Sequence, residues 1–189
     1  AQNHVGYRNL TILISRAYQE GQILGKPLLR REWIEPQRDG LLGLSGGRKG
    51  DVGQHLLAGR DREAKTALTW WMNHFPDRFY LELQRTGREY EEDYLHAAVA
   101  LAEHHECPVV ATNEVCFLSP GEFDAHEARV CIGDGRTLND PRSARSYSEQ
   151  QFLKSSEEML ALFADIPEAI ENTVHIASRC SLEIELGKA

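Results

Sequence analysis

The chain has 189 residues, of which 41% are hydrophobic and 26% are charged, and its formal net charge is −8. These values are typical of a soluble globular protein, and no apolar run approaches the roughly 20 residues that span a bilayer. An acidic chain is also a poor match for a protein whose main surface grips nucleic acid, because phosphate binding depends on clustered lysine and arginine.

Helices and strands alternate in the first half of the predicted fold. Apolar residues at helical spacing predict a helix over residues 4–20. A short apolar run at 41–44, closed by a Ser-Gly-Gly turn at 45–47, predicts a buried strand and a tight turn. An amphipathic helix is predicted over 64–75, and residues 79–83 then predict a strand rich in aromatic side chains.

The next two elements continue this alternation. Residues 94–102 predict a helix, and residues 108–113 predict a strand with little polar alternation, as expected where both faces of a parallel strand are covered. The order of strands and helices indicates parallel βα units. No G-x-G-x-x-G motif is present, so a dinucleotide-binding sheet has no support. We therefore predict an α/β fold that becomes helix-rich toward the C-terminus.

Four capping signals predict helix starts in the last third of the chain. Capping boxes begin at Ser119, Ser148 and Ser155, and the segment Asp165-Ile166-Pro167-Glu168 starts a last helix. The apolar face of that last helix is predicted to consist of Ile170, Val174 and Ala177.

Two further segments lie outside these elements. Residues 133–147 are rich in Gly, Asp, Asn, Pro, Arg and Ser, and we predict that they form the most mobile connection. The arginines in this segment are interpreted as a solvated loop rather than a nucleic-acid grip; they are Arg136, Arg142 and Arg145. Residues 181–186 alternate like a strand.

The four cysteines favour a reduced, cytoplasmic protein. They are Cys107, Cys116, Cys131 and Cys180, and none forms a C-x-x-C pair. A chain of this length has room for an apolar core and does not depend on disulfides for stability. We therefore expect free thiols.

Chemistry is expected at the carboxyl ends of the predicted strands, because functional groups of βα barrels cluster there. The potential metal ligands at these ends are Glu82, Glu114, Cys116 and His126. A phosphoester hydrolase holds two or more metals about 4 Å apart with His, Asp and Glu, and a set with a single histidine suits such ions poorly. The alternative is that Glu82 is a hydrogen-bonded buried carboxylate, while Cys116 and His126 serve in packing.

Two other motifs are open to a structural or a functional interpretation. The glycines of the turn at 45–50 are suited to positive φ, and its backbone amides could cradle an anion. The turn lacks the G-x-x-x-x-G-K-[ST] spacing of a nucleotide-binding loop. Trp70 and Trp71 are interpreted as core and groove packing rather than a base-stacking platform.

Five segments carry motifs of one known family. They read GLLGLSGG at 40–47, FPDRFYLEL at 75–83, PVVATNE at 108–114, DAHE at 124–127 followed by CIGDG at 131–135, and EEM at 157–159 continuing to FADIPEA at 163–169. In this order they resemble the PHP (polymerase and histidinol phosphatase) domain of bacterial DNA polymerase III alpha subunits, in its proteobacterial form. The likeness runs from residue 5 to about residue 186, so it covers nearly the whole chain.

The resemblance implies a fold. The family's domain is a distorted seven-stranded βα barrel, similar to a TIM barrel. Residues 1–189 are expected to be the middle and C-terminal part of one such PHP domain, incomplete at its N-terminal side, with no second domain. The family's opening H-x-H strand, which supplies its first metal ligands, is not among these residues.

The chain departs from the metal-binding members of the family at several ligand positions. Thr86 stands where those members have histidine, Glu114 replaces aspartate and Cys116 replaces histidine, whereas Glu82 and His126 remain. A metal cluster needs most of its ligands at once, and changes around a metal site cost about 10–100-fold in affinity each. The resemblance therefore implies five vestigial metal-site positions, with no catalytic residue, metal or cofactor in this chain.

The expected function follows from the resemblance. The parent protein would be a DNA-directed DNA polymerase, a nucleotidyltransferase of DNA replication whose Mg²⁺ is bound outside this chain. This segment would be a scaffold that docks the proofreading exonuclease subunit, and it would meet other replisome subunits and DNA through the parent protein, with no membrane partner. The alternative is a metal-dependent phosphoesterase or 3′–5′ exonuclease site in the PHP cleft. An unrelated α/β module is the third hypothesis.

Overall fold

A computed structural model describes residues 1–138, 147–184 and 187 of the chain. The helices, 3₁₀ segments (η) and strands of this part of the chain are, in order, α1 (His4–Glu20), β1 (Gln22–Ile23), β2 (Lys26–Pro27), α2 (Arg31–Ile34), η1 (Glu35–Gln37), β3 (Gly43–Leu44), η2 (Gly47–Lys49), α3 (Asp51–Leu57), α4 (Asp61–His74), β4 (Phe79–Gln84), α5 (Glu91–His105), β5 (Val109–Thr112), η3 (Pro120–Glu122), α6 (Phe123–Gly133), α7 (Ser156–Leu162) and α8 (Pro167–Arg179).

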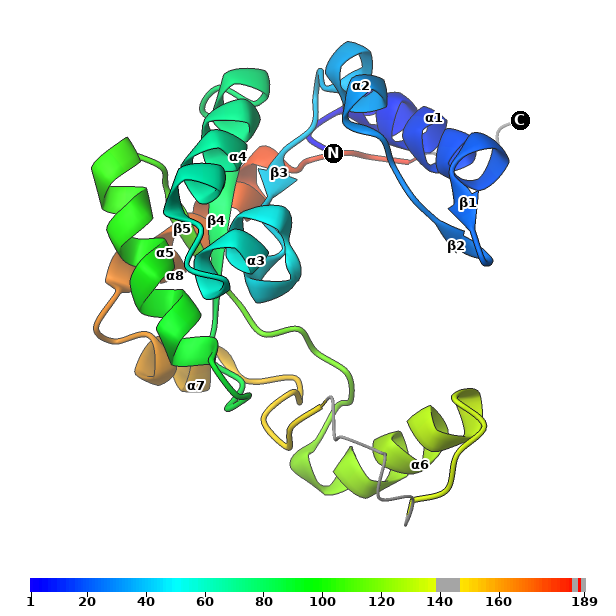
Figure 1. The fold of residues 1–189 in the computed structure, drawn as a ribbon, viewed down its shortest axis with the longest axis vertical. Helices are drawn as coiled ribbons and strands as arrows, with labels where there is room; N and C mark the ends of the chain where they lie inside the picture. Colours follow the sequence, from blue (N-terminus) through cyan, green and yellow to red (C-terminus); the bar gives the residue numbers. More distant parts are fainter. Residues whose placement is uncertain (139–146, 185–186, 188–189) are drawn as a thin grey trace.

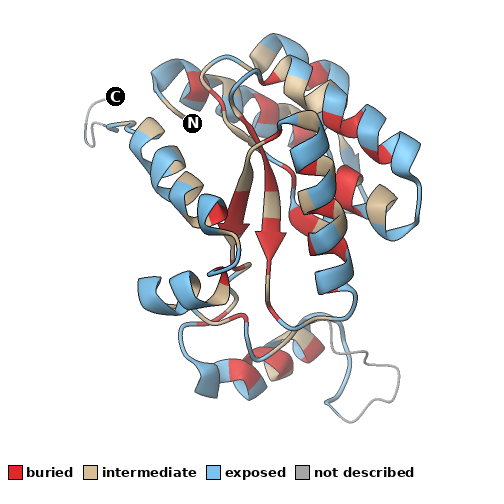
Figure 2. Cartoon of the chain, turned by 90° about the vertical axis from the view of Figure 1, so that its left-hand side faces the viewer, coloured by how far each residue is buried: buried red, intermediate tan, exposed pale blue. Residues whose placement is uncertain are grey.

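A parallel sheet with the strand order β3-β4-β5 lies at the centre of the fold (Figure 1). Leu44 of β3 pairs with Tyr80 of β4, and Leu81 of β4 pairs with Val109 of β5. Every residue of β4 except Glu82 is buried, and buried positions gather along the sheet in Figure 2. The predicted parallel βα arrangement is confirmed for this sheet, and the described residues form a mixed α/β fold.

Two apolar clusters meet along β4. The first packs Phe79 and Leu81, in the first half of the strand, against residues of α1 to α4. The second packs Leu83, together with Ala111 of β5, against α5, α8 and the residue that follows α7. Because one strand contributes to both clusters, β4 joins the two halves of the core.

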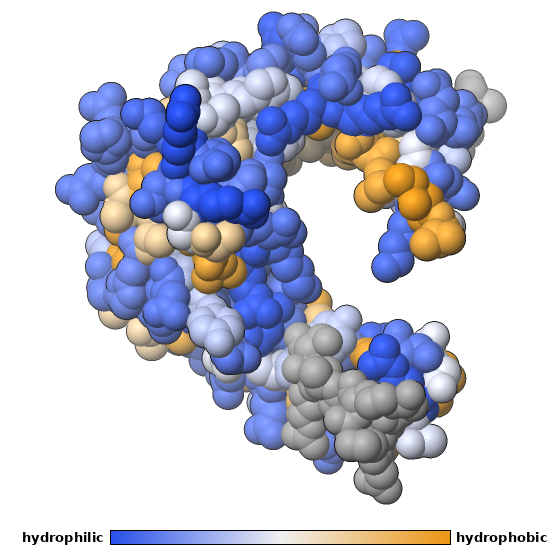
Figure 3. Space-filling view, in the orientation of Figure 1, coloured by the Kyte–Doolittle hydropathy of each residue, from blue (hydrophilic) through white to orange (hydrophobic). Residues whose placement is uncertain are grey.

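The elements form an open arc around a hollow. Figure 1 shows α3, α4, α5 and α8 gathered around the sheet, with α1 and the β1–β2 hairpin at one end of the arc and α6 at the other. Figure 3 shows the hollow between these ends and apolar side chains on the hairpin facing it. The exposed apolar side chains of the hairpin and the segment after it are Ile23, Leu24, Leu28 and Leu29. The hairpin, α2 and α3 were not predicted from the sequence.

Most of the predicted elements are confirmed, with shifts of a few residues at their ends. These are α1, α4, β4, α5, β5, α6, α7 and α8. The capping box at Ser119 forms, although the chain passes through η3 before α6 begins. None of the helices in the part of the chain that the structure describes combines the length and apolarity needed to cross a bilayer.

The helix predicted at Ser148 is wrong. Part of the predicted capping box does form, since the Ser148 backbone N–H donates to Gln151 Oε1 at 3.0 Å. However, the chain makes only a turn there and no helix follows. The Gln151 amide then donates to the backbone oxygen of Glu114 at 3.1 Å, and Phe152 forms a parallel bridge with Phe117. These long-range bonds hold the chain extended after the turn and outweigh the capping preference.

The strand predicted at 41–44 is shorter and less buried than expected. β3 has two residues, and Leu44 is 45% exposed. The reason is that β3 lies at the edge of the sheet, so that one side of it is unpaired within the described residues. Residues 181–184 form no strand, contrary to the prediction for 181–186, and residues 185–186 lie outside the described residues. The segment 139–146 of the predicted mobile connection, with Arg142 and Arg145, also lies outside them.

The predicted apolar face of α8 is only partly correct. Ile170 is half-buried, but Val174 is 66% exposed and Ala177 is exposed. Ala169 is the fully buried residue of this helix, because α8 packs against β5 with that side. Val174 is therefore left on an accessible surface.

The close approach of α1 to the turn before β3 generates a prediction. A Cβ atom on Gly6 would lie 1.9 Å from the backbone oxygen of Gly40. We expect Gly6→Ala to push α1 away and to lower the free energy of unfolding by about 1–3 kcal/mol, as overpacking does. Urea denaturation measures this change.

Gly133→Ala is the matched control, because no atom lies within 4 Å of the added Cβ and Gly133 is helical. It should leave the free energy of unfolding unchanged or raise it by up to about 1 kcal/mol. Equal losses in both variants would contradict the close contact.

Candidate functional site

The carboxyl ends of β3, β4 and β5 point to the same edge of the sheet, since the strands are parallel. Three loops leave this edge: residues 45–50 after β3, 85–90 after β4 and 113–119 after β5. Four of the five predicted site positions lie on β4 or on these loops, whereas His126 lies on α6. The contacts of each position decide which of them form one site.

The Glu82 carboxylate is held by the turn after β3. The Gly46 backbone N–H donates to Glu82 Oε2 at 2.5 Å, and the Thr112 hydroxyl donates to Glu82 Oε1 at 3.1 Å. Gly46 and Gly47 have φ values of +75° and +57°, which confirms the prediction of positive φ in this turn. The anion that the turn holds is thus the chain's own carboxylate.

Thr86 is fully buried and bound to the first turn of α5. Its hydroxyl donates to Glu91 Oε1 at 2.8 Å, and the Gly87 backbone N–H donates to Glu91 Oε2 at 2.9 Å. Glu91 is only 3% exposed. The position where metal-binding members have histidine therefore carries a hydroxyl that is already engaged by a buried carboxylate.

The Arg88 guanidinium lies at the centre of the strand ends. Its side chain is 5% exposed. Its Nε donates to the Thr86 hydroxyl at 2.8 Å, and its Nη2 donates to Gln84 Oε1 and to Glu91 Oε1, each at 3.3 Å. Its Nη1 lies 2.6 Å from Glu114 Oε2, an ion pair without hydrogen-bond geometry. One buried cation thus joins β4, α5 and the loop after β5.

Glu114 is neutralised from two sides. Lys49, at the end of η2, donates its ammonium to Glu114 Oε1, while Arg88 pairs with Oε2. Burial disfavours the charged form of Glu114, but the hydrogen bond from Lys49 and the positive charges of Lys49 and Arg88 outweigh it and lower the pKa of this carboxyl. The negative charge of Glu114 is therefore already neutralised by two cationic side chains of the protein.

Cys116 is held by the fully buried amide of Gln151. The side-chain amide nitrogen of Gln151 lies 3.5 Å from Cys116 Sγ, and the Cys116 backbone N–H donates to the Gln151 backbone oxygen at 2.8 Å. Burial, followed by the charge of Glu114, raises the pKa of the Cys116 thiol. The thiolate, which is the form that binds metals, is therefore harder to form at Cys116 than at an exposed cysteine.

His126 lines a small surface pocket together with Cys116. Glu82, Thr86 and Glu114 do not line this pocket. The pocket has a volume of about 360 Å³, and Cys116, Phe117, His126 and Arg129 are among its lining residues. His126 Nδ1 lies 3.0 Å from Arg129 Nη2, and the imidazole packs on the rings of Phe117 and Tyr147. Burial and the Arg129 charge lower the pKa of His126, so the ring is neutral at pH 7. These contacts agree with a packing role.

The donor set does not fit a metal centre. A divalent ion at the strand ends would compete for Glu114 with Lys49 and Arg88, and it would find an engaged hydroxyl at Thr86 and a protonated thiol at Cys116. Across residues 1–138, 147–184 and 187, no three His, Cys, Asp or Glu side chains are grouped so as to hold a metal ion. The strand ends form an internally paired ionic network instead.

Four residues that organise this network were not identified from the sequence; they are Lys49, Arg88, Glu91 and Gln151. A usable signal exists for Glu91, because the acidic first turn of a helix that follows an arginine favours a short-range ion pair. The pairing of Lys49 with Glu114 joins loops 65 residues apart, and no local pattern indicates it.

Comparisons with known proteins agree with the resemblance seen in the sequence segments. The profile of the family described as "PHP domain" matches residues 1–86. The chain is 54% identical, over 188 residues, to the DNA polymerase III subunit alpha of Pseudomonas aeruginosa and to that of Escherichia coli K12, and 49% identical to that of Haemophilus influenzae. Each match covers 100% of this chain and 16% of the relative, so the chain spans a small part of the length of these relatives.

Removal of the central cation should be costly. Arg88→Met keeps much of the side-chain volume but leaves the buried Glu91 carboxylate without its ion pair. We expect the free energy of unfolding to fall by about 3–5 kcal/mol, the usual result of breaking a buried pair. Urea denaturation measures it. Glu20→Gln is the control, because its pair with Arg16 is exposed and should change stability by less than about 1 kcal/mol. A loss for Arg88→Met as small as that of the control would contradict the network.

The lowered pKa of Glu114 predicts a pH dependence. A carboxyl whose pKa is lower in the folded than in the unfolded state stabilises the fold above its unfolded pKa of about 4.3, and this contribution disappears as pH falls through the folded pKa. Between about pH 6 and about pH 3, the free energy of unfolding should fall less steeply in Glu114→Gln than in the unmodified chain. Denaturation at a series of pH values measures both slopes, and identical slopes would mean that Glu114 gains nothing from its two cations.

Proposed function

The chain is homologous to the PHP region of bacterial DNA polymerase III alpha subunits, and on that premise we propose that it is a non-catalytic scaffold within the alpha subunit of a replicative polymerase. The whole subunit is proposed to be a DNA-directed DNA polymerase that acts in the cytoplasm and binds its Mg²⁺ outside this chain. The scaffold is proposed to dock the proofreading exonuclease subunit.

The finer fold assignment belongs to the same proposal. Residues 1–189 are taken as the middle and C-terminal part of one PHP domain, built as a distorted seven-stranded βα barrel. The parallel order β3-β4-β5 and the helices that cover it support this assignment. The unpaired edge of β3 and the hollow beside the sheet are where further strands of such a barrel would fit (Figure 3).

The observation that carries the scaffold proposal is the pairing of Glu114 with Lys49 and Arg88. A catalytic phosphoesterase site keeps its carboxylates available for metal ions. Here Lys49 and Arg88 bind the Glu114 carboxylate in place of metal ions, and the network links three loops at the strand ends. We propose that Glu82, Thr86, Glu114, Cys116 and His126 are vestigial positions whose side chains now serve stability.

Metal removal tests the proposed function. The full-length subunit is treated with a chelator, the chelator is removed, and binding of the purified exonuclease subunit is then measured by fluorescence anisotropy. We expect the dissociation constant and the thermal midpoint of the subunit to stay unchanged, because protein cations hold the strand ends.

A full-length subunit lacking residues 1–189 is the comparison, and it should lose the exonuclease. Two results oppose the proposal. Release of bound zinc or manganese together with the exonuclease would support the alternative of a metal-dependent phosphoesterase or exonuclease site. Retention of the exonuclease by the deleted subunit would rule out the scaffold role.

A further inference from the structure

The segment that carries α6 forms a lobe of its own at one end of the molecule. We call residues 117–138 and 147–152, the described part of this segment, the α6 lobe. Figures 1 and 2 both place it beyond the carboxyl ends of the strands. Within the described residues, α6 packs chiefly on η3, which belongs to the same lobe, rather than on the sheet or the helices that cover it.

The buried side chains of the α6 lobe are separate from the core around β4. The Phe117 ring lies 6.0 Å from the Phe123 ring and 5.4 Å from the His126 ring, measured between centroids, and His126 lies 4.5 Å from Tyr147. Phe117, Phe123 and Cys131 are buried, but none of them belongs to either of the two apolar clusters that meet along β4. Because local unfolding follows the boundaries between packed units, the lobe can open while the sheet stays folded.

Hydrogen bonds connect the α6 lobe to the strand ends. The side-chain amide of Gln151, which is fully buried, donates to the Glu114 backbone oxygen at 3.1 Å, and the Cys116 backbone N–H donates to the Gln151 backbone oxygen at 2.8 Å. The Ser148 hydroxyl donates to the Thr86 backbone oxygen. Ser148 and Gln151 thus bind the lobe to the loops after β4 and β5, and we call these two residues the latch.

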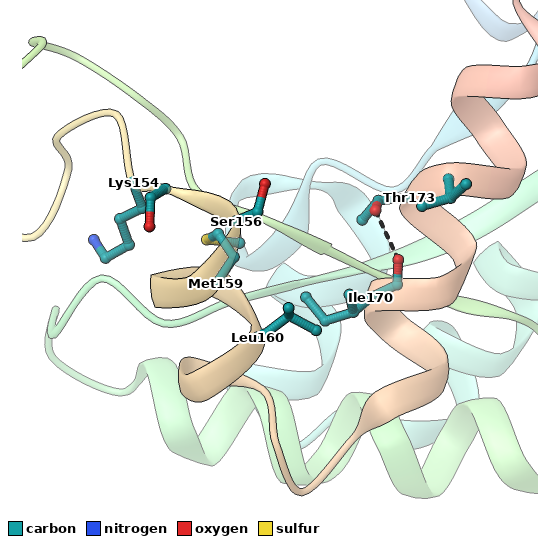
Figure 4. Close-up of a pocket in the computed structure, with 8 residues that line it drawn as sticks. Lys154, Ser156, Met159, Leu160, Ile170 and Thr173 are labelled. Atoms are coloured by element: carbon teal, nitrogen blue, oxygen red, sulfur yellow. Dashed lines mark hydrogen bonds between the residues drawn. The ribbon is translucent and has the colours of Figure 1, made fainter.

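Further hydrogen bonds hold the point where the chain leaves the α6 lobe. The Asn113 side-chain amide donates to the Phe152 backbone oxygen at 2.6 Å, and the Lys154 ammonium donates to Asn113 Oδ1 at 3.4 Å. Figure 4 shows this ammonium directed away from Leu160 and Ile170, which line the pocket between α7 and α8. Lys154 therefore serves the junction between the lobe and the strand ends.

The ionic network sets the position of both loops that the latch binds. Arg88 Nε donates to the Thr86 hydroxyl at 2.8 Å, and Arg88 Nη1 lies 2.6 Å from Glu114 Oε2. Thr86 and Glu114 are also the two residues whose backbone oxygens accept hydrogen bonds from the latch. A change in the network therefore moves the acceptors on which the α6 lobe is held.

We infer that the α6 lobe is a separately opening unit of the fold, which the latch of Ser148 and Gln151 holds closed on the ionic network at the strand ends. Its buried apolar residues are its own, so the bonds of the latch decide how often it opens. Elements that open at low free energy are those that move in conformational switching. The junction thus gives the protein a place where one lobe is ordered or released without unfolding of the sheet.

Hydrogen exchange of the full-length polymerase subunit, followed by mass spectrometry, tests the inference. Amides of α6 are expected to exchange about a hundredfold or more faster than amides of β4. Gln151→Met keeps the side-chain length but removes the amide, so exchange in α6 should become about tenfold faster or more, while exchange in β4 stays unchanged. Asn172→Leu is the control, because its amide also donates to a backbone oxygen, that of Val109 at 2.8 Å, but outside the lobe. It should leave exchange in α6 unchanged.

Equal exchange rates in α6 and β4 of the unmodified subunit would overturn the inference, because the lobe would then open only together with the whole fold. Unchanged exchange of α6 in Gln151→Met, or an equal acceleration in α6 and β4, would also overturn it, because the latch would then not control the lobe. If Gln151→Met fails to fold, as judged by circular dichroism, Ser148→Ala decides by the same comparison, since Ser148 is only half-buried.

Discussion

A guanidinium removed from water must meet acceptors on every side, and Arg88 meets four side chains at the point where the strands end. Gln84 comes from β4, Thr86 from the loop after it, Glu91 from the first turn of α5 and Glu114 from the loop after β5. These contacts fix the position of the first turn of α5 and hold the loops after β4 and β5 close together. Because the cation is buried, its loss would leave the buried Glu91 carboxylate without an ion pair, so the network constrains the whole edge of the sheet.

This constraint connects the fold to the proposed role. A hydrolase at the same edge would need exposed, unpaired carboxylates and imidazoles arranged around metal ions. In this chain the turn after β3 binds Glu82, Lys49 shares Glu114 with Arg88, and the His126 ring packs on Phe117 and Tyr147. Such an edge is rigid without a ligand. Rigidity suits a scaffold, because a partner that binds elsewhere on it meets a preformed surface.

Elements that local residues decide could be predicted from the sequence, whereas elements that distant contacts decide could not. Residues 79–83 were predicted as a strand from their aromatic side chains, and residues 108–113 from their lack of polar alternation. Ser148 and Ser155 carry the same capping signal, yet only Ser155 starts a helix, since the Gln151 amide is bound to Glu114 across the fold. The structure places Glu82, Thr86 and Glu114 together at the carboxyl ends of the strands, where the sequence pattern located them. The roles of Lys49 and Arg88 were not predicted. Both pair with Glu114, which lies in another loop, and neither the periodicity nor the spacing of residues in the sequence indicates such a pairing.

A double-mutant cycle between Arg88 and Glu114 tests most directly whether a protein cation holds the strand ends together. The free energies of unfolding of the unmodified chain, Arg88→Met, Glu114→Gln and the double variant give the coupling between the two side chains. We predict a stabilising coupling of about 1–3 kcal/mol, the range of residues in one ionic network. A coupling within about 0.3 kcal/mol of zero, the error expected for independent sites, would contradict the account.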